Sequence, residues 1–208
     1  MGSLVARTGR NLQRYNDGRR QVVGCVPYRY KEGIAETSLG VNNNNYNNNA
    51  EEAIEILVIT PQRKGKGMLF PKGGWETDEA IEDAALRETM EEAGVLGQVQ
   101  GKLGTWNFEN NNNKKKKATS YEGHMFALLV KEQLDSWPEM QFRQRHWISV
   151  GEARNACKQW WMKEALESLV NRLSKEIKKA IYSSHFATRC GAQILPPPAM
   201  GSLQKEPS

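Results

Sequence analysis

The stretch Gly73–Val95 constrains the fold of this 208-residue chain more than any other segment. Its second half is rich in alanine and carboxylates and contains no proline and no glycine before Gly94, which predicts an α-helix. Thr77 or Asp78 can cap the start of this helix, and Gly94 suits the left-handed residue that ends it. We therefore expect a helix from about Asp78 to Ala93.

One face of this helix begins apolar and ends acidic. Ile81 and Ala85 lie on the same helical stripe as three glutamates, because helix positions three, four or seven residues apart share a face. The three glutamates are Glu88, Glu91 and Glu92. Carboxylates at this spacing repel one another, so a cluster that faces a cleft requires a cation, and oxygen ligands suit magnesium or manganese. The alternative is a solvated acidic face, because charge runs usually lie on the surface.

The residues that flank the helix favour the first interpretation. Five residues separate Gly73 from Glu79, seven more lead to Arg87–Glu88, and Glu91–Glu92 stands one residue before Gly94. This pattern resembles the Nudix box, the signature of hydrolases that act on nucleoside diphosphates linked to another moiety. Every charged and every glycine position of that signature is filled.

The resemblance implies a role for each acidic residue. Glu88, Glu91 and Glu92 would bind divalent ions, Mg²⁺ or Mn²⁺, and the backbone carbonyl of Gly73 would add a ligand. One glutamate must take the proton from the attacking water. On the family pattern this base is Glu92, with Glu88 as the alternative.

Three further residues of the signature have expected structural roles. Arg87 and Glu79 lie on neighbouring turns, so Arg87 can pair with Glu79 or Glu91 and hold the loop against the helix. Gly94 ends the helix. Only Thr89 departs from the signature, because it stands where an aliphatic residue is usual, and this departure affects packing rather than chemistry.

The net charge of +5 is concentrated in two segments. Residues 1–31 hold seven basic residues against Asp17 alone, and Lys114–Lys117 add four, so the rest of the chain sums to −5. Nucleic-acid binding asks for a basic face with interleaved aromatic residues and is therefore not favoured. No apolar run reaches the roughly 18 residues that span a bilayer, which predicts an intracellular protein that does not enter a membrane.

We expect one folded domain of α/β class over residues 20–181. Residues 1–19 form a flexible basic segment that can be a transit peptide, a phosphate-binding arm or a plain tail, so the cytoplasm and the mitochondrion both remain open. Residues 182–208 are expected to be a disordered tail. Low-complexity loops interrupt the domain at 40–50 and at 110–118.

Strand patterns and a long amphipathic segment complete the predicted fold. The strand patterns cover residues 20–30, 54–60, 68–70, 99–108, 121–132 and 143–149. A capping box, Ser149 with Glu152, begins a helix, and the apolar stripe of residues 162–177 predicts a longer one. A mixed sheet between the box helix and this C-terminal helix is an α/β/α sandwich, which the Nudix resemblance implies as well.

Basic residues outside the box predict a very anionic small-molecule substrate. Lys72 can reach a phosphate oxygen as a point charge. The segments Phe70–Trp75 and Arg143–Arg145 resemble the Nudix subgroup of diphosphoinositol polyphosphate and diadenosine polyphosphate phosphohydrolases. The segments Val23–Arg29 and Trp160–Leu166 are similar to its plant members. Expected on the rim of the substrate pocket are Lys72, Arg20, Arg29, Arg143 and Arg145.

Two other functions remain open. The same chemistry can act on ADP-ribose, on a dinucleotide cofactor such as NADH, or on capped RNA. A catalytically inactive Nudix domain can instead serve as a ligand sensor, although all three glutamates of the box are present.

Overall fold

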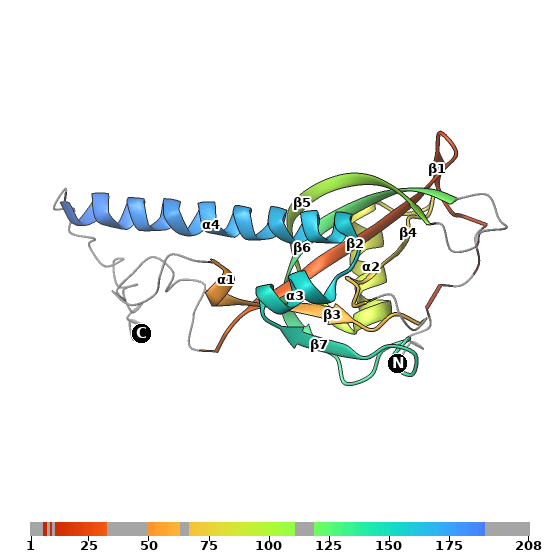
Figure 1. Ribbon diagram of the computed structural model, residues 1–208, viewed down its shortest axis with the longest axis horizontal. Coiled ribbons are helices and arrows are strands. Elements are labelled where there is room, and N and C mark those ends of the chain that lie inside the picture. Colours follow the sequence, from red (N-terminus) through yellow and green to blue (C-terminus); the bar gives the residue numbers. More distant parts are fainter. Residues whose placement is uncertain are drawn as a thin grey trace, which may run out of the picture.

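A mixed β-sheet with helices on both faces forms the body of the protein (Figure 1). The computed structural model describes residues 6–7, 9, 11–32, 50–62, 67–110 and 119–189, except for the side chains of 110 and 180–189. Most of the expected low-complexity loops, and the expected tail from residue 190 onward, lie outside the described residues.

Seven strands of the described chain form the sheet, in the order β5-β6-β2-β3-β7, with β1 and β4 also paired to β2. Their bounds are β1 Tyr15–Asn16, β2 Arg19–Tyr30, β3 Ile54–Ile59, β4 Lys72–Gly74, β5 Val95–Asn110, β6 Thr119–Gln133 and β7 Arg145–Ile148. Strands β2 and β6 run parallel, and the other pairs are antiparallel. The expected strand at 68–70 is reduced to a bridge between Leu69 and Ile59.

Strand β2 is central, which explains its continuous apolar composition. Its residues 21–28 are all buried, as expected for a strand covered on both faces. Pro27 lies inside this central strand although it has no N–H to donate. Proline is accommodated because β2 pairs with β4 only up to Gly24 and with β3 only from Tyr28, so Pro27 falls between two partners on that side.

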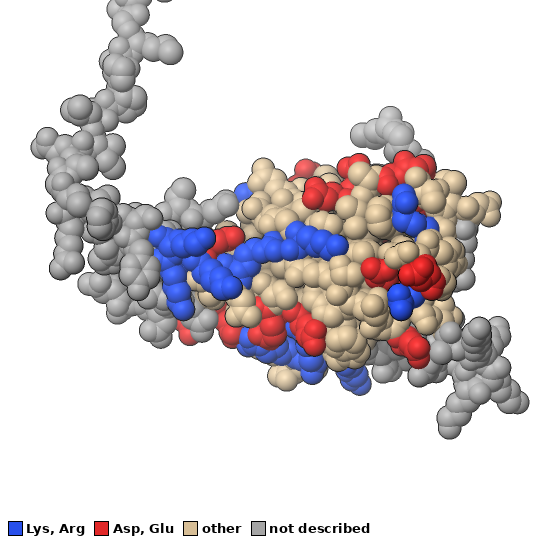
Figure 2. All heavy atoms as spheres, turned by 90° about the horizontal axis from the view of Figure 1, so that it is seen from above, with Lys and Arg blue, Asp and Glu red and all other residues tan. Residues whose placement is uncertain are grey.

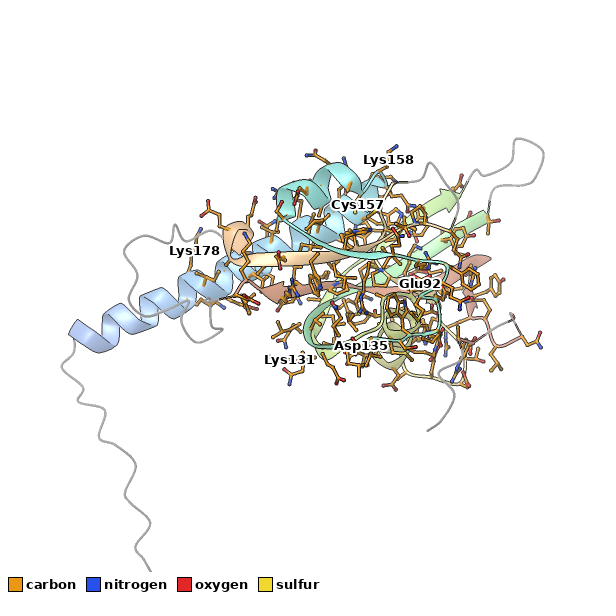
Figure 3. The ribbon with its side chains drawn as sticks, turned by 90° about the horizontal axis from the view of Figure 1, so that it is seen from below. Glu92, Lys131, Asp135, Cys157, Lys158 and Lys178 are labelled. Carbon is orange, nitrogen blue, oxygen red and sulfur yellow. The ribbon has the colours of Figure 1, made fainter. Side chains whose placement is uncertain are left out.

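Helices cover the two faces of this sheet, which confirms the predicted α/β/α arrangement. The helices are α1 Ala50–Ala53, α2 Ile81–Ala93, α3 Val150–Ala156 and α4 Trp160–Arg189. Figure 3 shows β2 and β3 between α2 on one side and α3 and α4 on the other. Helix α4 continues to Arg189, past residue 182 where the sequence predicted the tail to begin, and its C-terminal part extends beyond the sheet (Figure 1).

The helix ends test the capping predictions. The predicted caps Thr77 and Asp78 are wrong, because α2 begins after Ala80 and has no side-chain cap. The Asp78 carboxylate instead accepts a hydrogen bond from the Arg7 guanidinium at 3.1 Å. Gly94 ends α2 in the left-handed conformation with φ +63°, as predicted, and the Ser149 capping box at the start of α3 is also confirmed.

Among the described residues, no helix is both long enough and apolar enough to cross a membrane.

Candidate active site

Helix α2 presents Glu88, Glu91 and Glu92 on the side that packs against the sheet. Ala84 and Ala85 are fully buried under β2, which fixes how the helix is turned. Glu91 and Glu92 are also buried, at 5% and 6% exposure, so the cluster is not a solvated face. Thr89, the departure from the signature, is buried as well, and its hydroxyl donates to the Ala85 carbonyl at 2.7 Å.

Arg87 ties the loop before α2 to the helix. Its Nε and Nη2 donate to the two carboxylate oxygens of Glu79 at 2.9 and 2.7 Å, and Nη2 also donates to the Gly74 carbonyl at 2.9 Å. Burial works to raise the pKa of Glu79, but the hydrogen bonds from Arg87 and from the Glu76 backbone N–H, together with the charges of Arg87 and Arg7, hold that pKa below its usual range. Glu79 is therefore a charged structural partner of Arg87.

Glu88 lies directly against the backbone of Gly73. A Cβ on Gly73 would sit 1.8 Å from Oε2 of Glu88, so only glycine leaves room for this carboxylate. Glu88 also accepts a hydrogen bond from Nη1 of Arg87 at 2.8 Å. Burial raises the pKa of Glu88 to about 7, although Arg87 works in the opposite direction.

Glu91 shares the same guanidinium. Its carboxylate lies 3.5 Å from Nη1 of Arg87, and it accepts a hydrogen bond from the backbone N–H of Arg7 at 3.3 Å. Burial raises the pKa of Glu91 as well. Glu88 and Glu91 are thus held side by side by one positive group.

Glu92 has different partners from Glu88 and Glu91. One carboxylate oxygen accepts a hydrogen bond from the backbone N–H of Lys72 at 2.8 Å, and the other accepts from Nη2 of Arg143. Burial raises the pKa of Glu92, while the charges of Lys72 and Arg143 oppose that rise. Glu92 is therefore a desolvated carboxylate beside two basic residues.

The connection between β6 and β7 closes over the C-terminal end of α2. The backbone N–H of Glu139 donates to the Glu91 carbonyl at 3.1 Å, and that of Leu134 donates to the Gly94 carbonyl at 2.8 Å. Arg145 donates through Nη1 to the carbonyls of Ala93 and Gly94, at 3.1 and 2.9 Å. These bonds satisfy carbonyl groups that a helix end leaves without intrahelical partners.

The five basic residues predicted for the rim lie in different parts of the structure. Lys72 and Arg143 lie at the glutamate cluster, and Arg20 is close to the box, because its Nη2 would lie 3.0 Å from a Cβ on Gly74. Arg29 lies away from the glutamate cluster, because its guanidinium pairs with Glu55 at 2.7 Å. It is five residues along β2 from Gly24, the last residue of β2 that pairs with β4, and five strand residues span about 16 Å. Arg145 gives its donors to backbone carbonyls and stacks on Trp137.

Two residues near the cluster were not singled out from the sequence. Glu139 accepts a hydrogen bond from Nε of Arg143 at 2.6 Å, and Arg7 reaches Glu76 at 2.5 Å as well as Glu91. The spacing of four residues between Glu139 and Arg143 was a usable signal, because residues at that distance commonly pair within a helical turn. Nothing in the sequence around Arg7 indicates its contact with Glu91, 84 positions away.

The three clustered carboxylates of α2 have the chemistry of a divalent metal site. Their oxygens are the ligand type that Mg²⁺ and Mn²⁺ prefer, and the missing side chain of Gly73 leaves room for the Glu88 carboxylate. In the structure these oxygens accept hydrogen bonds from Arg87, Arg143 and the Lys72 N–H. Within the described ranges, no group of three or more Asp, Glu, His or Cys side chains is arranged to hold a metal ion. The three carboxylates therefore match a divalent ion in the chemistry of their oxygens, and Arg87 and Arg143 contact those oxygens in the structure.

Comparisons with known proteins agree with this geometry. The family model described as NUDIX domain matches residues 45–169. "Nudix hydrolase 18, mitochondrial" of Arabidopsis thaliana is 53% identical over 174 residues, which covers 84% of this chain and 89% of that protein. "Diphosphoinositol polyphosphate phosphohydrolase 3-alpha" of Mus musculus is 33% identical over 106 residues, which covers 50% of this chain and 60% of that protein.

Among solved structures, the binary complex of a C. elegans Ap4A hydrolase superposes with a TM-score of 0.52 at 19% identity. The superposition covers 74% of this chain and 98% of that one. At this identity the likeness supports the fold and nothing finer.

Proposed function

Because this chain belongs to the Nudix family, we propose that it hydrolyses a pyrophosphate bond in a very anionic substrate, a diphosphoinositol polyphosphate or a diadenosine polyphosphate. Family membership implies hydrolase activity, and enzymes of this family generally use divalent metal ions. The substrate class is the part that we infer.

The observation that carries the proposal is the setting of Glu92. A buried carboxylate there lies in contact with the guanidinium of Arg143 and with the backbone of Lys72. On α2, Glu88 lies about one turn before Glu92, and Glu91 directly precedes it in the chain. A site that combines carboxylates with basic side chains can bind a divalent ion and the phosphate oxygens of the substrate together. The mouse relative named above supports the same substrate class, over half of this chain.

In the proposed reaction, the acidic residues hold the metal ions and the basic residues hold the substrate. Glu88, Glu91, Glu92 and the Gly73 carbonyl would hold the divalent ions, which supply charge compensation and an acidified water. Lys72, Arg143 and Arg20 bind phosphate oxygens. Arg29 and Arg145 are left out of this set because of where the structure places them.

Proton transfer is assigned to a carboxylate of α2. Glu92 takes the proton from the attacking water, and Glu88 is the alternative base. Both carboxylates are buried, and burial raises the pKa of each, which moves a glutamate toward the range in which a general base works near neutral pH.

The test is phosphate release from four substrates in the presence of Mg²⁺ or Mn²⁺. The panel contains an inositol pyrophosphate, a diadenosine polyphosphate, ADP-ribose and NADH. We expect turnover of one of the first two and a loss of about 100-fold or more in Glu92→Gln, the usual effect of removing a general base. Glu82→Gln is the matched control, because Glu82 lies on the exposed side of the same helix.

Other outcomes of the panel would contradict the proposal in different ways. Turnover of ADP-ribose or NADH alone would keep the chemistry of the family and refute the anionic substrate class. No turnover of any of the four by folded protein would favour a ligand sensor.

A further inference from the structure

Arg143 contacts two acidic residues with two different nitrogens. Its Nη2 donates to Glu92, its Nε donates to Glu139 at 2.6 Å, and its Nη1 lies 3.4 Å from the Thr60 carbonyl. The Arg143 side chain is only 10% exposed and that of Glu92 only 8%. The pair with Glu92 is therefore largely desolvated.

Glu139 is held in place independently of Glu92. Its backbone N–H donates to the Glu91 carbonyl at 3.1 Å, and its own carbonyl accepts from the backbone N–H groups of Phe142 and Arg143, at 2.9 and 3.0 Å. The Gln62 side chain also donates to its carboxylate at 3.3 Å. Nη2 of Arg143 can therefore leave Glu92 while Nε stays on Glu139.

We propose that Arg143 is a substrate-operated latch on Glu92. In the absence of substrate, Nη2 of Arg143 neutralises the buried Glu92 carboxylate. When a polyphosphate binds, its oxygens take over Nη2, and Glu92 becomes available to a divalent ion. Glu139 is the positioning residue that keeps the guanidinium at the site during the exchange. This inference rests on the proposed function, because it requires a substrate that carries phosphate groups.

The physical basis is competition for one carboxylate. A buried carboxylate without a partner is costly, so the charged form of Glu92 requires either the guanidinium or a metal ion beside it. A guanidinium fork binds phosphate as readily as carboxylate, so phosphate can replace Glu92 as a partner of Arg143. Binding of the metal ion and binding of the phosphate group then favour each other, as linked equilibria require.

The test is Mn²⁺ binding by the full chain with no substrate present, measured by titration calorimetry. We expect Arg143→Gln to bind Mn²⁺ about tenfold more tightly than wild type, because Glu92 has lost its competing cation. Arg145→Gln is the charge control, since it removes a positive group that lies at the carbonyls of Ala93 and Gly94, next to Glu92. We expect at most a twofold change for this control.

Arg143→Lys is a second test variant, which keeps the proposal testable if Arg143→Gln does not fold. A lysine keeps the charge but cannot hold Glu92 and Glu139 with separate nitrogens of one fork, so an intermediate gain in Mn²⁺ affinity is expected. Circular dichroism and melting curves establish that each variant is folded. Affinity in folded Arg143→Gln or Arg143→Lys that is unchanged, weaker, or equal to that of Arg145→Gln would overturn the latch.

A double-mutant cycle tests the role of Glu139. Glu139→Gln removes one of the two carboxylates that contact Arg143, so the guanidinium pairs more strongly with Glu92. Mn²⁺ binding is therefore expected to weaken severalfold. In the Arg143→Gln background the same substitution should have a clearly smaller effect. Equal weakening in both backgrounds would mean a simple loss of negative charge and would refute the positioning role.

These results separate the latch from the proposed function. An enzyme that turns over the anionic substrates but fails the Mn²⁺ test refutes the latch alone. Failure in the substrate panel by folded protein refutes the proposed function, and the latch with it.

Discussion

Arg87 is the residue on which the geometry of the cluster depends most. It contacts Glu79, Glu88 and Glu91 and the carbonyl of Gly74, so it links the loop before α2 to both members of the carboxylate pair. Its side chain is 13% exposed and that of Glu79 is 8% exposed. Removing the guanidinium would leave several buried acceptors without a donor.

We therefore expect Arg87→Ala to lower the free energy of unfolding by about 3 kcal/mol, the usual cost of breaking a buried ion pair by removing one partner. Urea denaturation measures this. Lys163→Ala, at an exposed position of α4, is the control and should change it by less than about 0.5 kcal/mol. If Arg87→Ala lowers the free energy of unfolding by no more than the control, the contacts of Arg87 do not stabilise the fold.

Gly73 gives a prediction about activity. A Cβ there would displace the Glu88 carboxylate, whose oxygen lies 1.8 Å from that position. We expect Gly73→Ala to remain folded and to lose about tenfold or more in kcat, because a carboxylate displaced by about an ångström no longer acts at the reacting atoms. Gly151→Ala is the control, since a Cβ there meets nothing within 4 Å. Equal rates for the two variants would contradict the placement of Glu88.

At the scale of elements, the end of α2 and the β6–β7 connection form one unit. The connection supplies the donors for the last carbonyls of the helix, and Trp137 of this segment packs on Gly94. The same segment carries Glu139 and Arg143. The C-terminal end of α2 thus positions the segment that carries Arg143.

Substitution of Gly94 tests this unit. Its φ of +63° disfavours any residue with a Cβ, and a Cβ there would lie 2.7 Å from the Trp137 ring. We expect Gly94→Ala to lower the free energy of unfolding by about 2 kcal/mol or more, which a urea titration against Gly151→Ala would detect. A loss below about 0.5 kcal/mol would mean that the connection is not packed on the helix end as described.

At the scale of the whole molecule, much of the fold could be predicted and part of the site could not. The box helix and the sheet strands have strong local patterns, and the order of elements then implies the layers. Arg29 and Arg145 show the limit. The sequence gives their charge, but their partners Glu55 and the Gly94 carbonyl are set by register and by a loop, which no local pattern specifies.

The net charge of the chain also predicts little about the site. Figure 2 shows a row of lysine and arginine side chains that reaches the end of the molecule from which α4 extends. Exposed lysines of that helix include Lys175, Lys178 and Lys179, and Figure 3 shows Lys178 far from Glu92. The basic composition of the chain therefore says little about the site, where specific contacts of Arg143 and Lys72 matter.

A buried histidine makes the stability of the domain depend on pH. Nε2 of His124 on β6 lies 2.9 Å from Oε1 of Gln21 on β2, and Nδ1 lies 3.1 Å from the hydroxyl of Thr105 on β5. Burial, and secondarily the charge of Lys102, lower the pKa of His124. The folded protein therefore holds the ring neutral, and unfolding takes up a proton below the unfolded pKa of about 6.5.

The contribution of His124 is thus fully present above about pH 6.5 and is lost as the pH falls below it. Unfolding free energies of wild type and His124→Gln, measured between about pH 5 and 8, should converge toward the acid end. The difference between the two proteins is the useful quantity, because Glu88, whose pKa burial raises to about 7, titrates in the same range and affects both. A difference that is constant with pH would contradict a neutral, buried His124.

We have proposed that this Nudix site hydrolyses very anionic substrates and that Arg143 binds their phosphate oxygens. The most direct measurement compares kcat/KM for two substrates in wild type and in Arg143→Gln. The first substrate is the better of an inositol pyrophosphate and a diadenosine polyphosphate, and the second is ADP-ribose; the ratio is the first kcat/KM divided by the second. We predict a ratio above about ten in wild type that falls by at least tenfold in the variant, the size of a lost charge-assisted contact to phosphate. A wild-type ratio below one, or a ratio that Arg143→Gln leaves unchanged, would contradict the account.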